Sequence, residues 1–282
     1  MSKRRIVFIA DAFHEDIAGG GEINNSEAIY SFLEIGHDVH RVYSNDLTTD
    51  IVNNHKEDFF IVGNFVRASA ESLQSLFDKQ YLIYEHDHKY IQSRNPAIYE
   101  NYLAPKEDLV NIPFYENALG VLCQSGFHQD IVFKNTGLNN LHNLGGNLWP
   151  VLVLKHIREI SKKEKNNRFS IMDSNISHKN TEEAVRFCKA KKYDFELVRD
   201  RDYLKFLEKL GSNNGFVFFP KTPETLSRVV VEARMMDMKV VSNKNIGATK
   251  EEWFKLRGEE LIDFMLEKRV EIIDKILSYV EG

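Results

Sequence analysis

Short apolar runs alternate with amphipathic stretches along the whole chain, a pattern typical of a parallel α/β protein. The apolar runs predict strands over residues 5–10, 59–65, 81–84, 120–124, 141–144, 169–172, 195–198, 216–219 and 239–242. Residues 38–43 alternate between apolar and polar and predict a further strand. Apolar positions at helical spacing predict helices over residues 23–33, 69–79, 125–135, 150–160, 181–190, 203–210, 226–236, 251–256 and 261–280, with one or two more between 96 and 117. The basic polar linker 162–168 places a domain boundary near residues 147–167.

The stretch 216–248 combines a strand, a loop, a helix and a second strand. Its first strand ends at Pro220, Glu224 lies in the loop, and Glu232 lies eight residues later inside the helix. Open parallel sheets bind ligands at the carboxyl ends of their strands, so this loop is a candidate binding site. Arg228 shares a helix face with Glu232, and a capped surface helix with an Arg–Glu ion pair is the simpler interpretation.

The start of this helix also favours an anion. Its first-turn amides, around Leu226 and Ser227, would be unpaired, and such amides attract phosphate. A carboxylate deeper in the helix can hold a vicinal diol, and one at the mouth can hold a sugar hydroxyl.

The order Pro220, Glu224, Glu232, Ala233 followed by the strand 240–243 resembles the nucleotide-sugar signature of retaining GT-B glycosyltransferases of family 4. Thr225-Leu226-Ser227 replaces the Gly-Phe-Gly that is usual there, which leaves Ser227 as the small residue near phosphate. The resemblance implies an α/β GT-B fold, with two Rossmann-like domains facing a central cleft and a C-terminal helix returning to the first domain. Residues 1–150 would be the acceptor-side domain and residues 151–282 the nucleotide-sugar-binding domain, in a shortened member of the family.

A run of three glycines, followed by Glu22, comes after the first predicted strand. Glycines admit close backbone approach to phosphate, but this run is not the dinucleotide fingerprint, and a flexible hinge loop explains it equally well. The resemblance assigns Gly20, Gly21 and Glu22 to a turn that contacts donor phosphate and acceptor.

The most polar cluster of the first half, residues 85–89, follows the fourth predicted strand. His86 and His88 with nearby carboxylates allow a metal site, but no further His or Cys cluster completes a ligand set, and a solvated loop is the simpler interpretation. The resemblance implies that a histidine here contacts the donor sugar, with His86 the first choice and His88 the second. No metal is expected.

The loop after the strand 169–172 carries a basic candidate, Lys179. In the family an Arg and a Lys-Gly in this loop bind the donor diphosphate. Lys179-Asn180 matches the Lys-Gly, whereas Ser174 stands where the Arg is expected. A diphosphate favours more than one cation, so we expect Arg228 to supply the second. A surface lysine is the alternative for Lys179.

Composition narrows the function classes. The chain has 282 residues and a net charge of −5, which disfavours a nucleic-acid partner. Cys123 and Cys188 suit buried free thiols in a reducing compartment. The apolar N-terminal run is interrupted by Asp11, no stretch is long enough to span a membrane, and a cytoplasmic protein is expected.

The implied function is transfer of a sugar from a nucleotide-diphosphate sugar, UDP- or GDP-linked, to a hydroxyl acceptor with retention. Glu224, His86 and Lys179 would be catalytic; the donor-binding set would be Gly20, Gly21, Glu22, Lys179, Leu226, Ser227, Arg228 and Glu232. The nucleotide sugar is a co-substrate, and no other cofactor is implied. A glycan, a lipid or a small molecule would serve as acceptor, and contact with a membrane surface stays open. A nucleotide-sugar epimerase, a DNA-modifying glycosyltransferase and a non-catalytic binding protein remain as alternatives.

Overall fold

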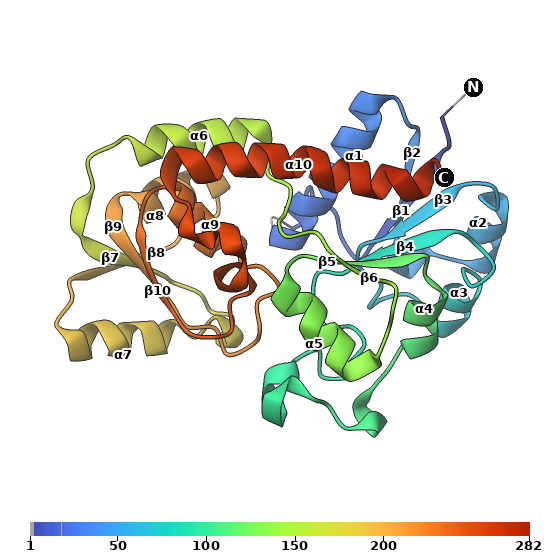
Figure 1. Cartoon of the computed structure of the whole chain (residues 1–282), viewed down its shortest axis with the longest axis horizontal. Helices are drawn as coiled ribbons and strands as arrows, with labels where there is room; N and C mark the ends of the chain where they lie inside the picture. Colours follow the sequence, from blue (N-terminus) through green and yellow to red (C-terminus); the bar gives the residue numbers. More distant parts are fainter. Residues whose placement is uncertain (1–2, 18) are drawn as a thin grey trace. The chain divides into compact units, whose positions relative to one another are not determined.

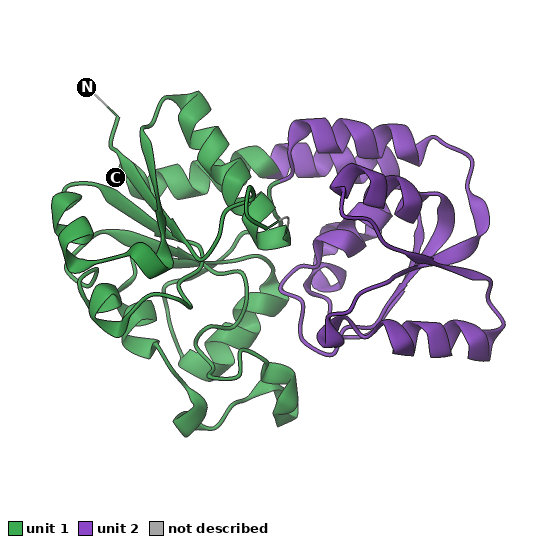
Figure 2. Cartoon of the chain, turned by 180° about the vertical axis from the view of Figure 1, so that it is seen from behind, with its two compact units in different colours: residues 1–148, 269–282 green, residues 149–268 purple. Residues whose placement is uncertain are grey.

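The computed structural model describes residues 3–17 and 19–282, and the chain divides into two compact units (Figures 1 and 2). Unit 1 comprises residues 1–148 and 269–282, and unit 2 comprises residues 149–268. None of the described helices is long and apolar enough to cross a membrane. Cys123 and Cys188 are both buried free thiols, as predicted.

Unit 1 is built on a parallel sheet in the order β2-β1-β3-β4-β5-β6. Its strands are β1 (Ile6–Ala10), β2 (Val39–Tyr43), β3 (Phe59–Val62), β4 (Tyr81–Tyr84), β5 (Gly120–Cys123) and β6 (Leu141–Asn143). Its helices are α1 (Gly20–Ile35), α2 (Thr49–Asn54), α3 (Ala70–Gln74), α4 (Ile112–Asn117) and α5 (Gly126–Thr136). The central strands are buried on both faces, which explains their unbroken apolar sequences.

Alternate residues of each strand in unit 1 face different helices. One face packs against α1 and the end of α10, through Phe8, Phe32 and Ile272 among others. The other face packs against α2, α3, α4 and α5, with Val7 and Phe60 in that cluster. The period-2 alternation of strand side chains therefore gives unit 1 a helix layer on each face of its sheet.

Unit 2 has a smaller parallel sheet in the order β10-β9-β7-β8. Its strands are β7 (Asn166–Met172), β8 (Phe195–Val198), β9 (Asn213–Phe218) and β10 (Lys239–Ser242). Its helices are α6 (Val151–Ser161), α7 (Thr181–Lys191), α8 (Tyr203–Gly211) and α9 (Arg228–Met235). One face is covered by α6, α8, α9 and the start of α10, and the other by α7. The fold class predicted from the sequence, an α/β protein with two parallel Rossmann-like sheets, is confirmed.

The long helix α10 (Gly258–Val280) begins in unit 2 and ends in unit 1 (red in Figure 1). Ile272, Ile273 and Ile276 are buried in the core of unit 1 beside β1 and α1. The predicted return of the C-terminal helix to the first domain is therefore confirmed.

Several predicted boundaries were wrong where the backbone leaves the helical region. Between 96 and 117 the structure has short 3-10 turns before α4, because Asn101, Tyr102 and Asn111 adopt positive φ angles. The predicted helix at 251–256 is a single 3-10 segment, Glu252–Lys255. The sequence favours Asp200 or Asp202 as the cap of α8, and the cap is Asp202, whose side chain accepts a hydrogen bond from the amide of Lys205.

Arg269 anchors α10 on α1 within unit 1. Its Nη1 lies 2.5 Å from Glu27 Oε2 and its Nη2 donates to Ser31 Oγ at 2.9 Å, with both charged side chains mostly buried. We expect Arg269→Met to lower the free energy of unfolding by about 2 kcal/mol, because the Glu27 carboxylate would lose its cation. Urea denaturation followed by circular dichroism measures this loss.

Arg257→Met is the matched control. Arg257 pairs with Asp237 at 3.2 Å, but both side chains are largely exposed, so we expect a change of no more than about 0.5 kcal/mol. Equal losses in the two variants would contradict the anchoring role of Arg269.

Candidate functional site

Unit 2 reverses the direction of sheet growth beside β7. The strand β8 lies on one side of β7 and β9 lies on the other, with α7 and α9 on opposite faces of the sheet. At such a reversal the loops that follow the two strands leave toward opposite faces of the sheet. A crevice forms between the loops at the carboxyl ends of the strands, and doubly wound proteins bind ligands there. The loop after β7 carries Lys179 and the loop after β9 carries Glu224, so the topology brings these two predicted residues together.

Lys179 and Glu224 form an ion pair at this point. Lys179 Nζ lies 2.8 Å from Glu224 Oε1, with the side chains 24% and 15% exposed. The backbone of Glu224 is fixed on both sides, because its amide donates to the Asn245 carbonyl and its carbonyl accepts from the amide of Gly247. The lysine is therefore preorganised but already neutralised by a carboxylate that an incoming anion would have to replace.

Glu232 lies on α9 and is almost completely buried, at 2% exposure. Its Oε1 accepts hydrogen bonds from the Trp149 indole at 2.9 Å and from the Tyr203 hydroxyl at 2.5 Å. Arg228, one turn before, has its Nε 3.7 Å from the same oxygen and its guanidinium over the Trp149 ring, 4.5 Å from the centroid. The predicted Arg–Glu pair is thus present, but it is buried inside unit 2 rather than on the surface.

The start of α9 differs from the prediction. The helix begins at Arg228, so Leu226 and Ser227 precede it; Leu226 is fully buried and its carbonyl accepts from the amide of Ala248. Ser227 occupies the cap position with φ 74° and is 6% exposed. Among the described residues no partner is seen for its buried hydroxyl. A buried hydroxyl without a partner at a helix start suits an anionic ligand.

The position where an arginine was expected holds Ser174 in a closed turn. The amide of Ser174 donates to Thr181 Oγ1 at 3.2 Å, and its hydroxyl accepts from the amide of Ile176. The loop after β7 also contacts the loop after β9, because the amide of Lys221 donates to the His178 carbonyl at 2.8 Å. Lys221 was not singled out from the sequence, since nothing local connects it with residue 178.

In unit 1 the glycine run forms the first turn of α1. Gly20 and Gly21 open the helix and Glu22 folds back, so that a side chain at Gly19 would overlap its carboxylate. Burial raises the pKa of Glu22, with Asp11 nearby adding negative charge. An acidic helix start suits hydroxyl groups better than phosphate. The predicted roles of Gly20, Gly21 and Glu22 stay predictions.

His86 lies beside this helix start, with its ring 3.6 Å from where a Cβ on Gly21 would be. Its Nδ1 faces Gln124 Nε2 at 2.7 Å and its Nε2 faces Asn25 Oδ1 at 2.6 Å. Because the Gln124 amide nitrogen can only donate, the arrangement fits a neutral imidazole whose proton is on Nε2. The asparagine in turn packs against Gly63, where any side chain would collide with it. His86 is therefore held rigidly, and its role toward a sugar stays a prediction.

The rest of the 85–89 cluster forms a closed network. Lys89 Nζ lies 2.6 Å from Glu85 Oε1 and 2.9 Å from Asp87 Oδ1, and the Tyr115 hydroxyl donates to Glu85 Oε2. Burial raises the pKa of Glu85 to about 7, and the charge of Lys89 opposes this shift. His88 Nδ1 faces the Tyr90 hydroxyl rather than a carboxylate. Across the described residues, no group of His, Cys, Asp and Glu is arranged to hold a metal ion.

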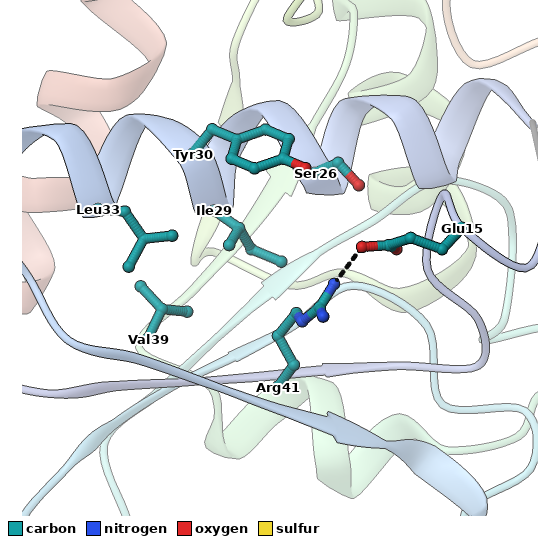
Figure 3. Close-up of a pocket in the computed structure, with 7 residues that line it drawn as sticks. All are labelled: Glu15, Ser26, Ile29, Tyr30, Leu33, Val39 and Arg41. Atoms are coloured by element: carbon teal, nitrogen blue, oxygen red, sulfur yellow. Dashed lines mark hydrogen bonds and ion pairs between the residues drawn. The ribbon is translucent and has the colours of Figure 1, made fainter.

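A pocket of about 190 Å³ lies between α1 and the edge strand β2 of unit 1 (Figure 3). It is lined by Glu15, Ser26, Ile29, Tyr30, Leu33, Val39 and Arg41. Its walls are mainly apolar, and Arg41 closes one end through a 2.7 Å ion pair with Glu15. None of these residues was predicted to bind donor.

Sequence reasoning missed Trp149 and Tyr203 as partners of Glu232. Tyr203 was expected only as the first residue of a helix, which it is. The contacts join Glu232 to residues 83 and 29 positions away, and no local pattern encodes either of them.

Together these features define a class of fold, the GT-B type, with two parallel Rossmann-like sheets and a C-terminal helix that contacts the first unit. No protein-family model matches the chain, and no curated protein sequence matches it.

Solved structures are similar to the chain at low identity. HepE from Anabaena, in complex with UDP and glucose, is 14% identical over 88% of this chain and 82% of HepE, with a TM-score of 0.58. The UDP-GlcNAc 2-epimerase of Methanocaldococcus jannaschii, with UDP-GlcNAc and UDP, is 10% identical over 95% of this chain and 92% of the epimerase, with a TM-score of 0.51. An alpha-glucosyltransferase with UDP and a 13-mer DNA containing an HMU base is 12% identical over 99% of this chain and 93% of that chain, with a TM-score of 0.50. At such identities the likeness concerns the fold.

Ser227 provides a test of the helix start. A non-glycine residue at φ 74° is strained, so we expect Ser227→Gly to raise the free energy of unfolding by about 1 kcal/mol. The same change removes the hydroxyl, so the nucleoside diphosphate binding expected from the sequence should weaken although the fold is more stable. Urea denaturation and calorimetry measure the two effects.

Asp237→Gly is the control, because Asp237 also has a positive φ, 59°, but lies past the end of α9. It should stabilise the chain similarly and leave nucleotide binding unchanged. If Ser227→Gly binds nucleotide as well as the parent chain, the hydroxyl has no part in the anion site.

Proposed function

We propose that this protein binds a nucleoside-diphosphate sugar in unit 2 and transfers the sugar to a hydroxyl acceptor with retention of anomeric configuration. The observation that carries the proposal is the meeting of Lys179 and Glu224 at the reversal of strand order in unit 2. The buried Glu232 on the following helix supports it, as do the UDP and UDP-sugar complexes of structures with the same fold.

The diphosphate would replace Glu224 as the ion-pair partner of Lys179. The Lys179 ammonium group would then pair with the diphosphate. The amides at the start of α9 and the Ser227 hydroxyl would be further hydrogen-bond donors to the diphosphate. Glu224, released from the ion pair, would hold the sugar near its anomeric carbon. Arg228 would add positive charge from α9, and Glu232 would accept hydrogen bonds from the ribose.

In the transfer step the bond between the anomeric carbon and the diphosphate oxygen breaks, and a bond to the acceptor oxygen forms on the same face. The acceptor proton passes to the leaving diphosphate, so the step needs no separate general base and no metal. Lys179 and the helix-start donors would stabilise the charge that develops on the leaving group.

Unit 1 would serve the acceptor and the sugar. In this proposal residues 1–150 form the acceptor-side domain and residues 151–282 the donor domain. His86 would contact the sugar, and Gly20, Gly21 and Glu22 would contact the acceptor and the donor phosphate. The rigid hydrogen bonds on both nitrogens of His86 suit a positioning contact better than proton transfer.

A second candidate is a nucleotide-sugar epimerase, which the fold-level likeness to the Methanocaldococcus jannaschii enzyme favours. It would convert a donor without any acceptor. A DNA-modifying transferase is favoured by the likeness to the DNA-bound alpha-glucosyltransferase and disfavoured by the net charge of −5.

Calorimetry of the full chain with UDP, GDP and ADP is the first test, and at least one of them should bind. Incubation of the matching nucleotide sugars without and then with hydroxyl acceptors, followed by mass spectrometry, separates epimerisation from transfer. Absence of binding by every nucleotide would overturn both enzyme functions.

Variants of the ion pair sharpen this test. Lys179→Met should weaken nucleoside diphosphate binding by about tenfold or more, because the preorganised cation is lost. Glu224→Gln should bind the nucleotide more tightly than the parent chain, because the competing carboxylate is gone, yet turn over donor far more slowly.

Lys189→Met on the exposed side of α7 is the matched control for charge, and it should bind as the parent chain does. Weaker binding in Glu224→Gln would contradict the exchange of partners at Lys179.

A further inference from the structure

The contacts of the Glu232 carboxylate all fall on one of its two oxygens. The Trp149 indole and the Tyr203 hydroxyl donate to Oε1, and the nearest approach of Arg228 is to Oε1 as well. The side chain is 3% exposed, and among the described residues no hydrogen bond to Oε2 is seen. The two oxygens of one carboxylate therefore have very different surroundings.

This asymmetry points to a ligand. Oε2 has no hydrogen bond within the described residues, yet it is not one of their fully buried atoms without a partner, so it keeps some access from outside the core. An ionised carboxylate oxygen with so little exposure is costly to leave without a donor, which favours a donor from a ligand. Because two donors converge on Oε1, the carboxylate cannot rotate without breaking both hydrogen bonds. Oε2 thus remains fixed as an acceptor for a donor that comes from outside the chain.

We propose that Trp149 and Tyr203 are positioning residues that lock Oε1 of Glu232, so that Oε2 selects a ribonucleotide over its 2′-deoxy analogue. This inference rests on the proposed function, in which Glu232 holds the ribose, and it deepens that function by assigning the sugar specificity to two residues that touch no ligand. A site built to accept a substrate hydroxyl strongly rejects the analogue without it, because its own polar group is then left unpaired.

The surroundings of both donors fit this task. Burial, followed by the neighbouring Glu232 carboxylate, raises the pKa of Tyr203, so its hydroxyl stays a proton donor at any physiological pH. Trp149 is 1% exposed and also supports the Arg228 guanidinium on its ring face. The indole N–H of Trp149 contacts Glu232 and the ring face contacts Arg228. A substitution can therefore remove the first contact and keep the second.

The experiment compares UDP with 2′-deoxy-UDP, and GDP with 2′-deoxy-GDP, by calorimetry on the full chain. In the parent chain we expect a preference of about tenfold or more for the ribonucleotide. In Trp149→Phe, which keeps an aromatic face for Arg228, and in Tyr203→Phe, the preference should fall to about threefold or less, with affinity for the deoxynucleotide nearly unchanged. The double variant should lose little more than either single variant, because both act through one oxygen.

Tyr193→Phe is the matched control, since Tyr193 in the same unit stacks on Phe169 and is partly exposed, and it should keep the full preference. A merely structural role for Trp149 or Tyr203 would weaken both nucleotides equally, and that result would overturn the inference while leaving the proposed function standing. Failure of the parent chain to bind any nucleotide would overturn both.

Discussion

The reversal of strand order beside β7 is the constraint on which the candidate site of unit 2 depends. With β8 on one side and β9 on the other, the connections after β7 and β9 must leave the sheet toward opposite faces. Their loops meet only at the carboxyl ends of the strands, and there the chain places a cation from one loop and a carboxylate from the other. Unit 1 follows the same rule around β1, where Asp11 accepts from the amides of Val66 and Arg67 after β3.

Two buried acids differ in how the chain satisfies their carboxylate oxygens. Glu85 is enclosed, because Lys89 takes one oxygen and Tyr115 takes the other. This network satisfies both carboxylate oxygens of Glu85, and its role is to stabilise the loop after β4. Glu232 is as deeply buried, but its protein donors share a single oxygen. The difference lies in which atoms are satisfied, and burial alone does not reveal it.

The sequence predicted the central strands of unit 1 well, because strands buried on both faces are apolar without interruption. It also predicted the cap of α8, since Asp202 acts on a backbone amide three residues away. It misplaced the start of α9, because the Leu226 carbonyl accepts from the amide of Ala248 in the distant loop after β10 and Ser227 adopts a positive φ. It placed Lys179, Glu224, Arg228 and Glu232 in the right elements but gave no sign of Trp149, whose contact with α9 spans 83 positions.

The charges around the strand reversal bear on the proposed donor site, in which Ser174 stands in place of an arginine. A fixed cation with no partner is costly to keep partly buried, and Glu224 removes that cost in the ligand-free chain. In the proposed function the diphosphate, which carries more charge than a carboxylate, replaces Glu224 at Lys179 and sets that acid free beside the sugar. An arginine at position 174 would offer Glu224 a second cation and would oppose this release. The single lysine, the uncharged Ser227 donor and the Arg228 held on Trp149 instead make the exchange depend on the ligand's extra charge.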